Sequence, residues 1–410
     1  MAVSLTDVSL DEDLSETFIE VDHFQVRKYH EKAAGDVFLS QKNHTDGRVI
    51  ATLSDGLGSG IKASVLATLA ATMATKFISF NIPIRRAAEI IMNTLPVCSE
   101  RGISYATFTL VDIETTAVVK IIEYHNPGYV LIRQQTMIEP IKEMTPFKRK
   151  NKKTGPKQDS FLFYSKYAAR PGDRLVFFSD GVTQSGMGTK ERPFGWGVGA
   201  QLFILETIKK TPDISARDLA RVIVQEAAFN DGGKPQDDIS CAVVYFRHPR
   251  NMLILTGPPV YPENDREIAR LLGAFEGIKV ICGGTTANII SRELEKPITM
   301  SWTDFDPKVP PMSRIEGADL VTEGIITMGV VSEILSANGE YEPGKKNAAT
   351  KIVDLLLNSD RITFVVGTKI NEAHQDPSMP VELEIRRNVI KKIAALLEER
   401  YLKEVRIQYF

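Results

Sequence analysis

Five aspartates at the ends of strand-like runs are the residues of this sequence whose type and spacing could do chemistry. Asp55 closes the apolar alternation in RVIATLSDG, and three glycines follow it within five residues. The others stand at similar boundaries: Asp36 before VFL, Asp180 after RLVFFS, and Asp237 with Asp238 before ISCAVVYF. A single Asp-Gly pair often makes only a turn. The interpretation as a metal site therefore depends on this recurrence.

Carboxylates that meet in one cleft would form an all-oxygen site. Because no paired His or Cys accompanies them, such a site selects Mg²⁺ or Mn²⁺ over Zn²⁺. Several carboxylates can hold two ions about 3.5–4 Å apart, which polarise a phosphoryl group and generate a hydroxide for in-line attack. The Gly56 carbonyl could reach the same ion as Asp55, since no side chain obstructs it. The pattern predicts phosphoryl chemistry without a nucleophilic side chain.

Strand, tight turn and helix are the elements expected around Asp55. Ser59 is a candidate N-cap for the helix, and Asn81-Ile82-Pro83 ends it. A second helix follows to Leu95, and three β-rich runs between residues 103 and 134 predict an antiparallel meander. The first helix is expected to turn one apolar face to the core, formed by Ile61, Val65, Leu66, Leu69, Met73 and Phe77.

After residue 248 the pattern changes to apolar runs that alternate with helical stretches. This alternation predicts a separate α/β domain, residues 249–410, with a largely parallel sheet. In the segment CGGTT, the backbone of Gly283 and Gly284 and the hydroxyls of Thr285 and Thr286 could hold an anion at a helix N-terminus. Simple turns before a capped helix are the alternative. The segment matches neither the dinucleotide nor the P-loop motif.

Length and composition bound the class of protein. The chain has 410 residues, enough for two domains, and its 50 basic and 52 acidic side chains give no overall attraction to nucleic acid or membrane. Cys98, Cys241 and Cys282 lie far apart, which favours a reduced setting without disulfides. The acidic N-terminus lacks the pattern of a signal peptide. The stretch from Ile61 to Phe80 contains two lysines, so we expect a cytoplasmic protein that does not span a membrane.

The motifs occur in the order GD, DGLGSG with its helix, SDG and DDIS. This order resembles the PPM family of metal-dependent Ser/Thr protein phosphatases, and most closely the bacterial branch typified by stage II sporulation protein E, over residues 20–247. The resemblance implies an α/β/β/α sandwich, with two antiparallel sheets covered by helices, in a first domain of residues 1–248.

The resemblance also implies a role for each motif residue. Asp55 is expected to bridge two Mn²⁺ or Mg²⁺ ions, assisted by the Gly56 carbonyl. Asp180 and Asp237 are expected to complete the centre, and Asp36 to bind the second ion directly or through water. Asp238 belongs to the same metal group, as a residue that supports the ligands. Many eukaryotic relatives carry a phosphate-gripping arginine near the first strand; here Arg27, Lys28 and Lys32 are the candidates.

By resemblance, the substrate is phosphoserine or phosphothreonine on a regulatory protein of the anti-anti-sigma type. The helix pair at residues 59–95 is similar to a switch element that couples partner contacts to metal occupancy, and a second copy of the chain is a candidate partner there. A different class of function stays open. The phosphatase fold could be a scaffold whose C-terminal domain binds a nucleotide or another anionic ligand as a sensor.

Overall fold

The computed structural model divides the chain into two compact units, residues 1–248 and 249–410. The structure describes residues 17–43, 46–58, 60–96, 106–147, 160–301, 306, 309–337, 339, 341, 346–368 and 380–410. Cys98 and the proposed helix cap Ser59 lie outside these residues.

The first unit contains two antiparallel sheets. One has the order β1-β11-β10-β6-β7, with β1 at Phe18–Val26, β11 at Ile239–Arg247, β10 at Arg174–Phe178, β6 at Val130–Arg133 and β7 at Thr136–Ile138. The other has the order β2-β3-β4-β5-β9-β8, with β2 at Asp36–Lys42, β3 at Val49–Gly56, β4 at Ala106–Ile113, β5 at Val118–Tyr124, β9 at Ser160–Ala168 and β8 at Glu143–Phe147. These sheets are called the β11 sheet and the β3 sheet below.

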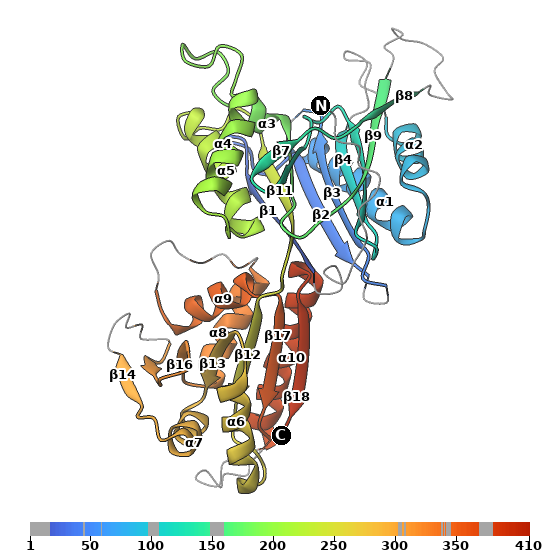
Figure 1. The fold of residues 1–410 in the computed structure, drawn as a ribbon. Helices are drawn as coiled ribbons and strands as arrows, with labels where there is room; N and C mark the ends of the chain where they lie inside the picture. The colour runs from blue at the N-terminus through green and yellow to red at the C-terminus, as the bar shows by residue number, and fades with distance from the viewer. Residues whose placement is uncertain are drawn as a thin grey trace. The chain divides into compact units, whose positions relative to one another are not determined.

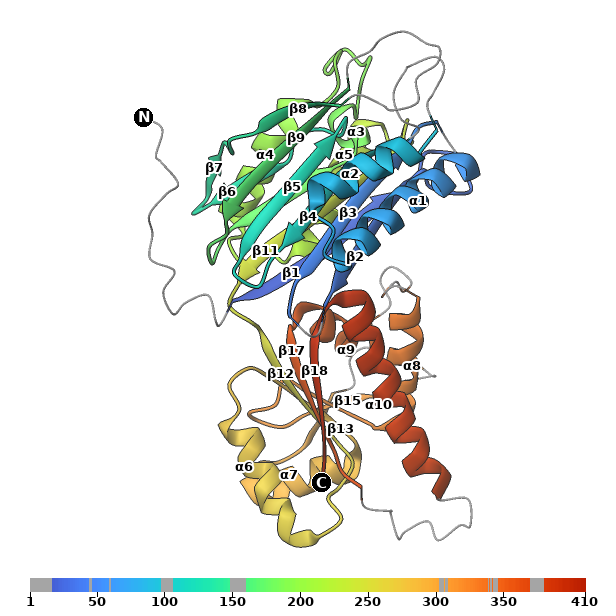
Figure 2. The same cartoon turned by 90° about the vertical axis from the view of Figure 1, so that its right-hand side faces the viewer.

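Helices cover the outer face of each sheet (Figures 1 and 2). Helices α1 (Gly60–Ser79) and α2 (Ile84–Thr94) share a buried core with β3, β4 and β5. On the other side, α4 (Val198–Lys210) and α5 (Ala216–Asn230) share a core with β6, β10 and β11. The short helix α3 (Asp180–Thr183) follows β10 directly. Two antiparallel sheets between two helical layers confirm the predicted fold of the first unit.

The face that α1 buries differs from the prediction. Ile61, Val65 and Leu69 were expected in the core but are exposed, whereas Ala63, Ala67, Ala70, Ala71, Ala74 and Ile78 are buried. The small side chains let the helix lie close to the sheet, so alanine rather than the larger aliphatics determines the buried face. Only Leu66, Met73 and Phe77 of the predicted face pack against the core. By length and composition alone α1 could cross a membrane, but its alanine face is buried, as in a core helix.

The predicted three-stranded meander is also wrong in one strand. Strands β4 and β5 pair as expected, but β6 leaves the β3 sheet and pairs with β10 and β7. His125, at a φ of 56°, and the following Asn-Pro-Gly form the connection between the sheets. A turn sequence fixes the end of a strand but not the partner of the next one.

The second unit contains one sheet with the order β14-β15-β16-β13-β12-β17-β18. The parallel strands are β12 (Asn251–Thr256), β13 (Ile278–Cys282), β16 (Leu320–Thr322), β17 (Arg361–Val366) and β18 (Glu404–Tyr409). The antiparallel edge consists of β14 (Thr299–Ser301) and β15 (Met312–Arg314). The helices are α6 (Asp265–Ala274), preceded by a single 3₁₀ turn at Pro262–Asn264, α7 (Gly284–Leu294), α8 (Ile325–Ser336), α9 (Ala348–Asn358) and α10 (Pro380–Tyr401). The largely parallel sheet confirms the predicted class of this unit.

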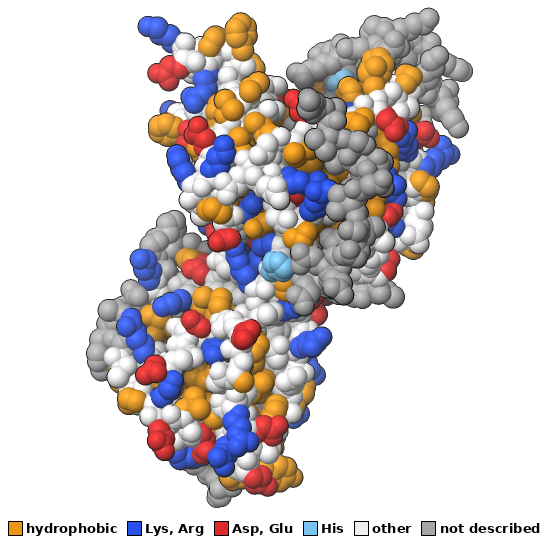
Figure 3. Space-filling model, in the orientation of Figure 1, with side chains coloured by type: hydrophobic (Ala, Val, Ile, Leu, Met, Phe, Trp, Pro, Cys, Tyr) orange, Lys and Arg blue, Asp and Glu red, His pale blue; other side chains and the backbone are white. Residues whose placement is uncertain are grey.

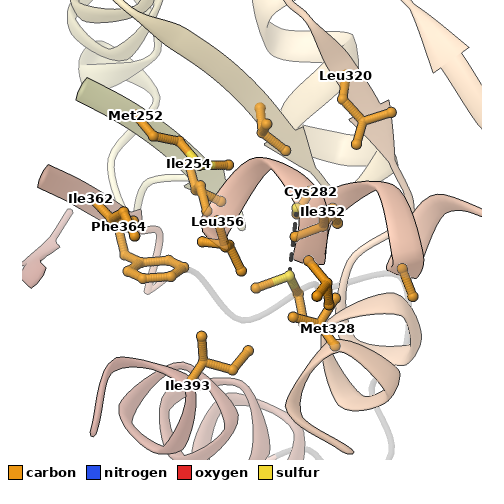
Figure 4. Close-up of a cluster of buried hydrophobic side chains, with 14 of the residues drawn as sticks. Met252, Ile254, Cys282, Leu320, Met328, Ile352, Leu356, Ile362, Phe364 and Ile393 are labelled. Carbon is orange, nitrogen blue, oxygen red and sulfur yellow. Dashed lines mark hydrogen bonds between the residues drawn. The ribbon is translucent and has the colours of Figure 1, made fainter. Parts of the chain in front are cut away.

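Helices pack on both faces of this sheet. One core forms between the strands and α8, α9 and α10, with Cys282 beside Met328 (Figure 4). The other contains α6 and α7. Burial raises the pKa of the Cys282 thiol to about 12, so this cysteine behaves as a small apolar side chain.

Figure 3 shows basic and acidic side chains interspersed on the face in view, with neither sign dominant.

Candidate active site

Two of the predicted aspartates lie opposite each other in the β3 sheet. Strands β2 and β3 are antiparallel neighbours, and their register pairs Asp36 directly with Asp55. Asp36 begins β2 and Asp55 lies near the end of β3, so both stand at the same edge of the sheet. The two residues are far apart in sequence but close in space, because in an antiparallel pair the start of one strand lies beside the end of the next.

The other predicted aspartates lie at an edge of the β11 sheet. Strand β10 ends at Phe178, which pairs with Cys241 of β11. Asp180 therefore follows the end of one strand, and Asp237 and Asp238 precede the start of its antiparallel neighbour. The two sheets thus supply two pairs of strand ends, each carrying carboxylates.

The two pairs lie near one another, because Gly35, next to Asp36, donates its N–H to Asp238 at 2.7 Å. Burial, and then the negative charges of Asp180 and Asp237, raise the pKa of the Asp55 carboxyl to about 7. A carboxylate responds in this way when like charges lie near it in a region that excludes water. Asp55 is therefore at the centre of the group, between the two sheets.

Asp36 is the most deeply buried member. It is 4% exposed, and its Oδ2 has no hydrogen-bond partner among the described residues. Burial and the Asp55 charge raise the pKa of Asp36 well above its usual range, while the nearby hydroxyls of Ser240 and Ser179 lower it. An unpartnered buried carboxylate oxygen is costly, and a bound cation would remove that cost.

Asp238 has a different role from its neighbour. Its two carboxylate oxygens accept hydrogen bonds from the backbone N–H of Lys28, at 2.9 Å, and of Gly35, at 2.7 Å. These bonds tie the loop before Asp36 to the start of β11. Through these two bonds Asp238 supports the loop that carries Asp36.

The glycines of the two Asp-Gly pairs allow close backbone contacts. A Cβ on Gly56 would lie 2.2 Å from the carbonyl oxygen of Ala63 in α1, and one on Gly181 would lie 2.1 Å from the carbonyl oxygen of Asp238. Any side chain would push these segments apart. The glycines therefore fix the distances between the elements that carry the carboxylates.

Three polar residues of the site were not predicted. Ser179 Oγ accepts a hydrogen bond from the N–H of Ser240 at 3.1 Å, which links the ends of β10 and β11. Gln184 donates to Asp180 Oδ2 at 2.8 Å. The two serines belong to the SDG and DDIS motifs, so their positions in the motifs were the available signal; nothing in the sequence marks Gln184.

The donor set fits a hard divalent cation. The group consists of oxygen ligands only, it has excess negative charge, and it includes the unpartnered Asp36 oxygen. Within the described ranges, however, no three His, Cys, Asp or Glu side chains already stand at coordination distances from one point. Carboxylates that repel one another are expected to close up only around a cation.

The candidate phosphate-binding cations lie on the loop after β1. The Arg27 guanidinium donates to the Lys32 backbone carbonyl at 2.8 Å, and both side chains are exposed. Lys28 is held at the site through its backbone, by Asp238. The structure brings this loop to the carboxylates but does not single out one of the three residues.

The predicted anion-binding segment lies in the other unit. Gly283 follows β13, and α7 begins at Gly284. Thr285 is exposed, whereas Thr286 is buried. The two predicted sites therefore belong to separate units.

Two antiparallel sheets between helical layers, with carboxylates at their strand ends, are the arrangement found in PPM-type protein phosphatases. A family model described as Stage II sporulation protein E (SpoIIE) matches residues 45–247. These residues form a SpoIIE-type domain of the PPM phosphatase family, so the first unit is a Ser/Thr protein phosphatase domain. The match begins after β2, so Asp36 lies outside it.

Solved structures with a similar fold belong to related phosphatases. The phosphatase domain of SpoIIE from Bacillus subtilis is 16% identical with a TM-score of 0.41, over 57% of this chain and 94% of that one. RsbX in complex with magnesium is 14% identical with a TM-score of 0.39, over 56% and 95%. The SiaA-PP2C domain of Pseudomonas aeruginosa is 16% identical with a TM-score of 0.39, over 55% and 85%. No curated protein matches the chain.

Proposed function

We propose that the protein hydrolyses phosphoserine or phosphothreonine on a regulatory partner protein of the anti-anti-sigma type, in the cytoplasm, with two Mn²⁺ or Mg²⁺ ions. The observation that supports it is the position of Asp55, whose pKa is raised to about 7 by burial and by carboxylates from the other sheet. Asp36, Asp55, Asp180 and Asp237 would hold the ions, with the Gly56 carbonyl. The ions, when bound, would supply the Lewis acidity that activates a water molecule.

The chain's own residues would prepare the site for this chemistry. Asp238 fixes the loop that carries Asp36, and Gln184 orients Asp180. Residues Arg27, Lys28 and Lys32 would place positive charge where a phosphoryl group enters. No side chain acts as a nucleophile in this proposal.

The test is hydrolysis of p-nitrophenyl phosphate and of a phosphoserine peptide, with Mn²⁺, with Mg²⁺ and with EDTA. Asp180→Asn should lose more activity than the 10- to 100-fold typical of residues that only support metal ligands. Asp46→Asn is the matched control, because Asp46 is exposed and precedes β3 at the end opposite Asp55. Metal-independent turnover, or full activity of Asp180→Asn, would contradict the proposal.

A second copy of the chain is the proposed partner at the helix pair. Helix α1 presents Ile61, Val65 and Leu69 to solvent, and their spacing of four residues places them in one row. Association would bury this row. Sedimentation velocity should show a dimer for the wild type and a monomer for Val65→Lys with Leu69→Lys. Equal oligomeric states would refute this assignment.

A further inference from the structure

Four parallel strands of the second unit end in one row. The sheet register pairs Thr256 with both Cys282 and Val366, and Cys282 with Thr322. Gly257, Gly283 and Gly367 directly follow three of these residues, and Gly324 follows the fourth after one position. Open α/β sheets bind ligands beyond such carboxyl ends. This edge is therefore where a ligand of the second unit would bind.

Two helix N-termini meet at this edge. Helix α7 begins after Gly283 and α8 begins after Gly324, and neither cap residue provides a side-chain hydrogen bond. A Cβ built on Gly324 would touch the Gly283 Cα, at 3.6 Å, so the two caps are neighbours. The N–H groups of a first helical turn have no acceptor within their own helix. The positive ends of two helix dipoles thus lie side by side.

A buried threonine occupies the third position of each helix. Thr286 is 1% exposed and Thr327 is fully buried, and neither hydroxyl has a hydrogen-bond partner in the described part of the chain. The Thr286 Oγ1 lies 3.5 Å from the position that a Cβ on Gly283 would occupy. The hydroxyl is therefore close to the cap residue of α7. Buried hydroxyls are rarely left without a partner. The Thr286 hydroxyl is therefore placed to donate to an acceptor at these helix ends, and Thr327 holds the equivalent position of α8.

We propose that the N-termini of α7 and α8 bind one oxyanion, a phosphate or carboxylate group of a small molecule. The backbone N–H groups of the first turns donate to it, together with the hydroxyls of Thr286 and Thr327. Glycine at both caps leaves room for the group to approach the backbone.

Glu323 restricts the rest of the ligand. Its carboxylate lies 3.2 Å from the position of a Cβ on Gly284, and it is exposed. A bare dianion would be repelled by this carboxylate. A hydroxyl or ammonium group next to the oxyanion would instead donate a hydrogen bond to it. The ligand class is therefore a hydroxylated phosphate or an amino acid.

The test is hydrogen exchange of the full chain in EDTA, followed by mass spectrometry, with ribose 5-phosphate or serine as the probe and ribose as the neutral control. A bound oxyanion should slow exchange at least fivefold in peptides that cover residues 284–286 and 325–327. Peptides at the first unit's carboxylates report any binding there separately. Protection by ribose 5-phosphate alone would identify a phosphate ligand, and protection by serine alone would identify an amino acid. Protection by neither probe would overturn the proposal.

Threonine-to-valine variants separate binding from a structural role. Thr286→Val and Thr327→Val keep the branched shape but remove a hydroxyl that has no partner. Without a probe, each variant should melt at or above the wild-type temperature, and each should lose at least fivefold in affinity for the probe that protects. Ser332→Ala is the matched control, because this residue also has a buried, unpartnered hydroxyl in α8, two turns from the site. Unchanged affinity in both threonine variants would overturn the proposal.

Discussion

The stability of the metal-free protein should fall as the pH rises, because Asp55 is held at a pKa of about 7, against an ordinary value of 3.8. Below pH 4 the carboxyl is protonated in both the folded and the unfolded chain, so it contributes nothing. Above pH 7 it is charged in both, and the folded state carries the full cost. Each pKa unit corresponds to about 1.4 kcal/mol, so that cost is about 4 kcal/mol as an upper value.

Removing the charge should reverse this loss. In EDTA at pH 8, Asp55→Asn should raise the free energy of unfolding by up to about 4 kcal/mol, and at pH 5 by about 1.5 kcal/mol. Neighbouring carboxylates that adjust their own protonation will lower both values. With Mn²⁺ the order should invert, because only the wild type gains stability from the ions.

The assay is urea unfolding followed by tryptophan fluorescence. The chain has two tryptophans, and a Trp302→Phe background leaves Trp196, which packs in the core beneath α4 and α5, as the reporter of the first unit. Asp46→Asn should change the unfolding free energy by less than about 0.5 kcal/mol, as usual for a surface residue. The reasoning fails if Asp55→Asn is no more stable than the wild type at pH 8, or if its effect is equal at the two pH values.

Three further perturbations test the packing of the first unit. Arg133→Met leaves the fully buried Asp173 without its ion-pair partner and should cost about 3–5 kcal/mol in urea unfolding. In α1, Ala70→Leu should cost about 1–3 kcal/mol by overpacking, whereas Val65→Ser should change the stability of the monomer by less than about 0.5 kcal/mol, and the reverse order would restore the predicted helix face. Gly181→Ala places a Cβ 2.1 Å from a backbone carbonyl and should lower Mn²⁺ affinity in calorimetry; unchanged affinity would show that the contact does not position the carboxylates.

Strand ends were predictable from the sequence because they depend on local pattern. Alternation followed by Asp-Gly marks the end of a strand whatever the strand pairs with. The approximate position of each carboxylate was therefore accessible, as was the alternation of strands and helices after residue 248. The resemblance to a known family then supplied which strand ends should meet.

Packing partners were not predictable in the same way. A helix with apolar residues on several sides does not reveal which side is buried. In α1 the side with the alanines is buried, because small side chains allow the closest approach to the sheet. The pairing of β6 with β10 depends on tertiary contacts, as does the contact between Gly283 and Gly324. The hydrogen bond between Ser179 and Ser240 could not be predicted either, since 61 residues separate the two serines in the sequence.

Strand β11 connects the carboxylates to the start of the second unit. It begins directly after Asp238 and ends at Arg247, one residue before the boundary between the units. All nine of its residues are buried, with β1 on one side and β10 on the other. Beyond the boundary, the Arg250 N–H donates to the buried Asp360 carboxylate at 2.7 Å.

A strand that is buried and paired on both sides cannot shift along its own axis in small steps. Slippage by one residue would exchange its two buried faces and move Asp237 and Asp238 by about 3.4 Å. No intermediate position keeps the hydrogen bonds, so small displacements at the junction are not passed along β11. The strand is a fixed anchor for its half of the site. A signal that opens or closes the site is more readily passed through the other half, where Asp36 and Asp55 stand beside the alanine face of α1.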